Sequence, residues 1–134
     1  METHFLGQVT LKAVLRYGRF FVLVREMNDN KWILPGGRMN VDEDPESGLA
    51  REINEELSVD ATVGDIISVG AYHGGQKSKT PKLFVFYSAI VSPNQELVTD
   101  KKEIVEFALV SQKEELEKYP MHENQRKVIE KFLA

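Results

Sequence analysis

Residues 82–91 form the segment that most constrains how this chain can fold. Successive side chains of a β-strand point to opposite faces of the sheet. In this segment both faces are apolar, with Leu83, Val85 and Tyr87 on one and Phe84, Phe86 and Ile90 on the other. A strand that is apolar on both faces has to be covered on both sides. The segment therefore predicts a central strand between two other layers.

The remaining segments supply those layers. We expect strands at 8–16, 20–25, 32–34, 59–71 (with a break at Gly64-Asp65) and 104–110. We expect helices from Asp44-Pro45 to about residue 57, from the capping-box pattern Ser111-x-x-Glu114, and along the apolar stripe Val128, Ile129, Phe132 and Leu133. Strands with helices on both faces predict an α/β fold, an α/β/α sandwich around a mixed β-sheet. At 134 residues the chain, 1–134, is expected to form a single domain.

Composition excludes several classes of protein. The chain has no cysteine, which excludes disulfide scaffolds, thiolate metal sites and cysteine nucleophiles. With 17 basic and 21 acidic residues it lacks the basic excess of proteins that hold nucleic acid by its phosphates, so no stable nucleic-acid complex is expected. No apolar run approaches eighteen residues and no secretory signal is visible, so we expect a cytoplasmic protein without a membrane partner.

The helix expected at 44–57 carries an unusual acidic face. At 100° per residue, Leu49, Ala50, Ile53 and Leu57 share an apolar stripe, and Glu52, Glu55 and Glu56 share one polar face. Like charges at this spacing are destabilising unless a cation joins them. Alone, the pattern is more typical of a solvated face, in which Arg51 offsets Glu55. It also suits Mg²⁺, which prefers oxygen ligands and phosphate-bearing substrates.

The residues upstream of this face change the interpretation. Gly37 is followed after five residues by Glu43, and after seven more by Arg51-Glu52-Ile53-Asn54-Glu55-Glu56-Leu57-Ser58-Val59. This run resembles the signature of the Nudix hydrolase family, except that Ser58 replaces the closing glycine. Asn40 and Asp42 also stand where the family often has Glu and Gly.

The resemblance implies hydrolysis of a nucleoside diphosphate linked to another group, with a small nucleotide as substrate. It implies that Glu52, Glu55 and Glu56 ligate Mg²⁺, for which Mn²⁺ is a possible substitute, with a backbone carbonyl from Gly36 or Gly37. Arg51 would orient the glutamates. Glu43 would tie the preceding loop to the helix or, alternatively, reach a metal through water.

Other candidates are weaker. In many members of the family a glutamate in a later loop serves as base or ligand, and Glu103 is the candidate here. Arg25 and Arg38 flank the expected site and are candidates for binding phosphate. The loop at 73–82 carries His73, Lys77, Lys79 and Lys82, a basic patch that is either a steering surface or merely solvated. Phe84, Phe86 and Tyr87 are expected in the core rather than stacked on a base.

Gly48 lies between Glu52 and Glu55 on the helical wheel, although a glycine inside a helix costs about 1 kcal/mol relative to alanine. One hypothesis is that its missing side chain leaves room for the hydrated metal and the pyrophosphate. The other is close packing of the helix on a neighbouring strand.

The sequence leaves open whether the substrate is a nucleoside triphosphate or a nucleotide sugar such as ADP-ribose. A non-catalytic nucleotide-binding regulator is the alternative function. The oligomeric state is also open, and a homodimer is possible.

Overall fold

The computed structural model describes residues 4–73 and 80–134. Its described part contains one seven-stranded sheet. The strands are β1 (Gln8–Tyr17), β2 (Phe20–Glu26), β3 (Trp32–Ile33), β4 (Gly36–Arg38), β5 (Thr62–His73), β6 (Pro81–Val91) and β7 (Ile104–Val110). The main order is β3-β2-β1-β6-β5, with β4 paired to β1 and β7 to β2. Because β1 and β6 are parallel and the other pairs are antiparallel, the sheet is mixed, as predicted.

Strands β1 and β2 separate after their shared turn. They pair only at Arg16↔Phe21 and Tyr17↔Phe20. Further along, β1 pairs with β4, in the register Thr10↔Arg38 to Lys12↔Gly36, while β2 pairs with β7 and β3. The sheet is therefore split between β1 and β2, and the split leads toward the end of the sheet that carries β4.

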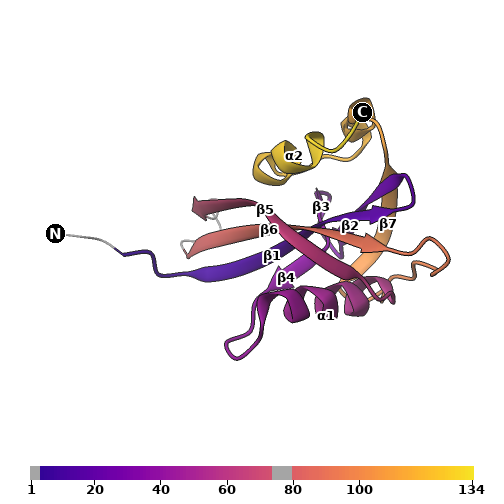
Figure 1. The fold of residues 1–134 in the computed structure, drawn as a ribbon. Helices are drawn as coiled ribbons and strands as arrows, with labels where there is room; N and C mark the ends of the chain where they lie inside the picture. The colour runs from indigo at the N-terminus through magenta and orange to yellow at the C-terminus, as the bar shows by residue number, and fades with distance from the viewer. Residues whose placement is uncertain (1–3, 74–79) are drawn as a thin grey trace.

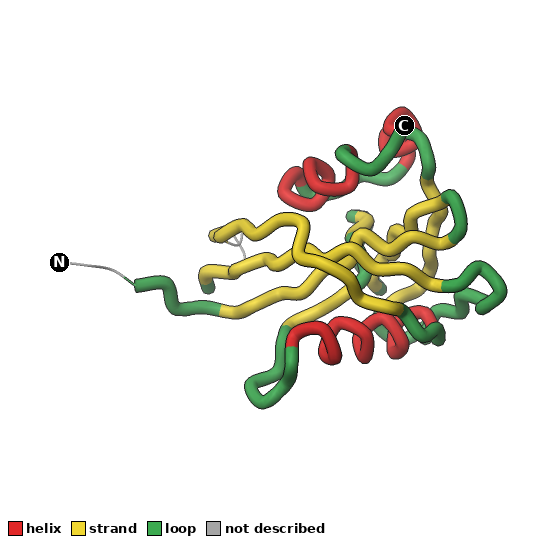
Figure 2. Tube along the Cα trace, viewed as in Figure 1, coloured by secondary structure: helices red, strands yellow, loops and turns green. Residues whose placement is uncertain are grey.

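Helices cover both faces of the sheet (Figure 1). Helix α1 (Pro45–Leu57) lies on one side, and η1 (Lys113–Lys118) and α2 (Glu123–Glu130) lie on the other. Figure 2 shows the same three layers, with red helices on either side of the yellow strands. The α/β/α sandwich predicted from the two apolar faces of β6 is confirmed. No helix in the described part of the chain is long and apolar enough to span a bilayer.

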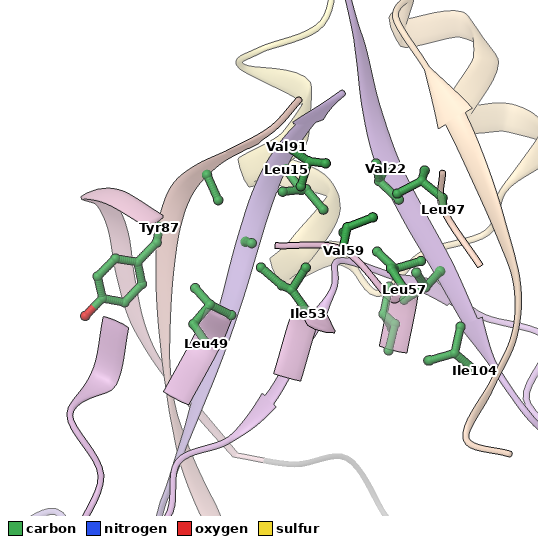
Figure 3. Packing of buried hydrophobic residues seen from close by; sticks show 14 of the residues in the cluster. Leu15, Val22, Leu49, Ile53, Leu57, Val59, Tyr87, Val91, Leu97 and Ile104 are labelled. Atoms are coloured by element: carbon green, nitrogen blue, oxygen red, sulfur yellow. The ribbon is translucent and has the colours of Figure 1, made fainter. Parts of the chain in front are cut away.

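Each face of the sheet has its own apolar core. Leu49, Ile53 and Leu57 of α1 are fully buried. They pack against β1, β2 and β6, where Leu15, Val22 and Tyr87 lie (Figure 3). Phe84 and Phe86, on the opposite face of β6, join the core under α2. The expectation that Phe84, Phe86 and Tyr87 are core residues is therefore confirmed, whereas Ile90 is exposed.

Local signals set the start and end of α1. Asp44 is the N-cap, and its carboxylate accepts a hydrogen bond from the Ser47 amide at 3.3 Å. Pro45 follows at the first turn, where it costs no hydrogen bond. At the other end Ser58 adopts a left-handed conformation, with φ 61°, at the position where the family signature has glycine.

The C-terminal helices differ from expectation in detail. The carboxylate of Glu115, not Glu114, accepts hydrogen bonds from the amides of Ser111 and Gln112, so the helix start is one residue later than predicted. The segment that follows is a 3₁₀ helix rather than an α-helix. In α2 the apolar stripe is buried as expected, except that Phe132 beyond its end is partly exposed.

Candidate active site

A cavity of about 1190 Å³ lies at the split between β1 and β2. Parts of the chain that are distant in sequence line it: β1, β4, α1, the segment before β7, and the start of α2. Its acidic end contains Glu52 and Glu56 of α1, with Glu26 at the end of β2 and Glu103 before β7. The helix and the later loop that the sequence singled out thus meet in one cavity.

Glu56 is the most buried of the three helical glutamates, with 5% of its surface exposed. Its carboxylate accepts a hydrogen bond from the Gly36 amide of β4 at 3.0 Å. Burial raises the pKa of Glu56 to about 8, against the opposing effects of Lys12 and the Gly36 amide. With so high a pKa the carboxyl group holds a proton near neutral pH, unless a cation beside it favours the charged form.

Glu52 lies beside Glu56 and close to the backbone of β4. A Cβ added at Gly37 would lie 2.8 Å from the carboxylate oxygen Oε2 of Glu52, so a side chain at this position would displace that carboxylate. Burial raises the pKa of Glu52 as well, and the charges of Glu55 and Glu103 add to the effect. Of the four residues expected at the metal site, Gly37, Glu52 and Glu56 are therefore close together.

Glu55 points elsewhere. Its carboxylate is exposed and pairs with Arg51, at 3.1 Å from Nη1. The other nitrogens of the same guanidinium reach Glu43, with Nε 2.7 Å from Oε2, and Glu52, at 3.4 Å from Nη2. The Glu43 and Glu55 contacts hold the pKa of Arg51 above its usual value. Arg51 thus joins three glutamates, and Glu43 ties the preceding loop to α1, as expected.

Carboxylates do not form a complete metal cage here. Among the described residues, no three His, Cys, Asp or Glu side chains converge as ligands for a metal ion. Mg²⁺ usually takes one or two protein carboxylates and leaves its other positions to water and substrate phosphate. The buried carboxylate of Glu56 and the partly buried carboxylate of Glu52, both beside the backbone of β4, fit that pattern.

The two arginines expected near the phosphates have different positions. Arg38 is exposed and lines the cavity. Arg25 instead lines a shallow depression with Asn28, Asp29 and Asn30. Its guanidinium pairs with Glu106 at 2.6 Å and donates to the Asp29 carbonyl at 2.9 Å. Arg25 therefore belongs to the link between β2 and β7 in this structure.

The structure describes only part of the basic loop at 73–82. Lys82 lines the cavity, whereas Lys77 and Lys79 lie outside the described residues, as does the His73 side chain. Whether the loop steers a substrate stays a prediction.

Neither hypothesis for Gly48 is correct. A Cβ at this position would lie 2.5 Å from Oε1 and 2.9 Å from Cγ of Glu43. The space over Gly48 is thus filled by a side chain of the preceding loop, and not by a strand or by room for a metal. The residue is glycine because the Glu43–Arg51 pair crosses the helix there.

The sequence analysis missed Lys12 and Gln125, which are among the buried polar residues of this cavity. Lys12 of β1 is 5% exposed and donates from Nζ to the Leu34 carbonyl at 3.0 Å. Gln125 of α2 is 3% exposed and accepts a hydrogen bond from the Leu34 amide at 2.8 Å. The lysine was visible as the one charge within the apolar run VTLKAVL. Nothing comparable marked Gln125.

Comparison with known proteins shows the family of this chain. The NUDIX domain family model matches residues 9–132, and the chain belongs to that family. A MutT-like protein of Streptomyces ambofaciens is 36% identical over 57 residues, or 42% of this chain and 37% of that protein. The matched region thus spans little more than a third of that curated relative.

Solved structures show the same fold over nearly the whole chain. The MutT protein of Methanosarcina mazei Go1 has a TM-score of 0.79 and 24% identity, with coverage of 98% of this chain and 96% of the other. The Escherichia coli dihydroneopterin triphosphate pyrophosphohydrolase has a TM-score of 0.77 and 15% identity, with coverage of 93% and 94%.

Proposed function

We propose that this protein is a Mg²⁺-dependent hydrolase of a pyrophosphate bond in a small nucleotide, with Mn²⁺ as a possible substitute. The observation that carries the proposal is the pair of the partly buried Glu52 and the buried Glu56, which lies against the glycines of β4 in a cavity of about 1190 Å³. Two carboxylates whose pKa values are raised by burial are costly unless they serve a cation or a proton transfer.

Glu52, Glu56 and the Gly37 carbonyl are the groups proposed to hold the ion. When bound, Mg²⁺ would neutralise phosphate oxygens and lower the pKa of a water molecule. Glu55 is the third proposed ligand, although in this structure its carboxylate is held by Arg51. Binding through Glu55 would require that exposed ion pair to open, which costs little for a solvated pair.

The remaining residues would act on the substrate and the attacking water. Glu103 lines the cavity and is exposed, so it is the proposed base that takes the proton of water. Arg38, at the edge of the cavity, is proposed to bind a non-bridging phosphate oxygen. Arg25 is left out of this proposal because Glu106 and the Asp29 carbonyl already occupy its guanidinium.

The class of nucleotide that the protein hydrolyses can be identified from the reaction products. Nucleoside triphosphates, ADP-ribose and nucleotide sugars would be incubated with the protein and Mg²⁺, and the released monophosphate, phosphate or pyrophosphate measured. We expect turnover of at least one class that disappears with EDTA and returns with Mg²⁺ or Mn²⁺. Nucleotide binding without any turnover would instead favour the non-catalytic regulator.

A further inference from the structure

Lys12 is a buried cation that the proposed function does not use. It lies in the middle of β1, lines the cavity, and is 5% exposed. Lysine is almost never so deeply buried unless its charge is paired. Its ammonium donates one hydrogen bond to the Leu34 carbonyl at 3.0 Å, although an ammonium carries three donors. A structural role at Leu34 alone would not require a charged group.

The surroundings of Lys12 are acidic. Burial lowers the pKa of the Lys12 ammonium, and three carboxylates of the cavity, Glu56, Glu26 and Glu52, oppose that shift, Glu56 most strongly. Residue Gly36 of β4 lies beside both Lys12 and Glu56. It pairs with Lys12 in the register of β1 and β4, and its amide donates to Glu56 at 3.0 Å. Lys12 and Glu56 therefore approach the same residue of β4 from different layers.

We propose that the Lys12 ammonium is a built-in counter-cation for Glu56, which weakens the binding of a free divalent ion and makes that binding depend on a diphosphate being present. This inference rests on the proposed function, because it assumes that Glu56 holds the ion. Two cations beside one carboxylate repel each other. A diphosphate entering the cavity adds negative charge that compensates for both, so ion and diphosphate should bind cooperatively.

The test measures Mn²⁺ binding at pH 7.5 by titration calorimetry and by the electron paramagnetic resonance signal of free Mn²⁺. It is performed with and without methylenediphosphonate, a pyrophosphate analogue that is not hydrolysed. Lys12→Gln keeps a hydrogen-bond donor for Leu34 but removes the charge, and Lys12→Met removes both. Lys12→Arg keeps the charge. Lys82→Gln removes a different, half-buried cation of the same cavity.

We expect Lys12→Gln and Lys12→Met to bind Mn²⁺ alone about fivefold more tightly than the wild type, since removal of one nearby charge is worth this much even at high dielectric. The gain in affinity caused by methylenediphosphonate should shrink by a similar factor. Lys12→Arg should resemble the wild type. Lys82→Gln should change the affinity less than twofold, because solvent screens its charge.

Several results would overturn the inference. They are unchanged or weaker Mn²⁺ binding in the two neutral variants, an equal gain in Lys82→Gln, or unfolding of both neutral variants, seen by circular dichroism. Unfolding of both variants would mean that the charge of Lys12 serves to hold the fold together and not to weaken ion binding. Glu56→Gln, measured in parallel, separates this failure from that of the proposed function. Wild-type Mn²⁺ affinity in Glu56→Gln would refute the metal site itself.

Discussion

The carboxylate of Glu43 fills the space that a side chain at Gly48 would need, with 2.5 Å between its Oε1 and an ideal Cβ. From there it binds Arg51, whose Nε lies 2.7 Å from Oε2. The signature glutamate is thus coupled sterically to a helical position whose residue the signature does not specify.

This coupling predicts a non-additive pair of substitutions. In a Glu43→Ala background, Gly48→Ala should raise the free energy of unfolding by about 1 kcal/mol, the usual gain in helix propensity. In the wild type that gain should be mostly lost, because the new methyl group displaces Glu43 from Arg51. Urea unfolding of the four proteins measures the difference. Equal stabilisation in both backgrounds would show that Glu43 moves aside without cost.

Ser58→Gly should stabilise the protein. Ser58 has φ 61°, a left-handed conformation that favours glycine. The substitution loses the exposed hydrogen bond from Oγ to the Val98 carbonyl at 3.0 Å, which offsets part of the gain. We expect a net rise of about 0.5 kcal/mol, visible as a higher Tm in calorimetry. A lower Tm would mean that the Val98 contact outweighs the backbone strain.

The stability of the metal-free protein should fall as pH rises from about 4.5 to 8. Burial raises the pKa of Glu56 to about 8 in the folded state, from an ordinary value of 4.5. Within that window the folded protein holds a proton that the unfolded chain releases, so rising pH favours unfolding. In Glu56→Gln the fall should be smaller, while Lys12, Glu26 and Glu52 still surround the position. Denaturant midpoints across this pH range provide the comparison, and parallel curves for the two proteins would contradict the assignment.

Divalent ions should stabilise the folded protein through the same carboxylates. An ion that binds only the folded state raises its stability by mass action. Millimolar Mg²⁺ should therefore raise the Tm of the wild type, and this rise should be nearly absent in the double variant Glu52→Gln with Glu56→Gln. Glu106→Gln, which changes a glutamate on β7 paired with Arg25, is the matched control. A similar Mg²⁺ effect in all three proteins would locate the ion elsewhere.

Local sequence patterns were enough to predict those structural features that a single type of residue determines. The Asp44-Pro45 start of α1, its buried Leu49 stripe, and the two apolar faces of β6 follow from helix capping and from periodicity. The capping box near Ser111 was one residue off, because neighbouring glutamates 114 and 115 offer the same group and only the backbone path selects one.

The site was harder to predict because the burial of each glutamate depends on tertiary packing. On a helical wheel Glu52, Glu55 and Glu56 look equivalent. Contact with β4 buries Glu56, whereas Arg51 holds Glu55 at the surface. The split between β1 and β2, which brings Lys12 into the cavity, results from pairing between segments distant in the sequence. No periodicity within β1 reports that pairing.

The most direct test of the proposed activity is the turnover of Glu56→Gln at saturating Mg²⁺ on the best substrate from the nucleotide panel. The amide can still accept the hydrogen bond from Gly36 but cannot supply a negative charge. We predict a fall in kcat of at least about a hundredfold in a protein that remains folded, the scale expected when a group that stabilises the transition state is lost. Turnover close to that of the wild type would contradict the assignment of Glu56 to the metal site.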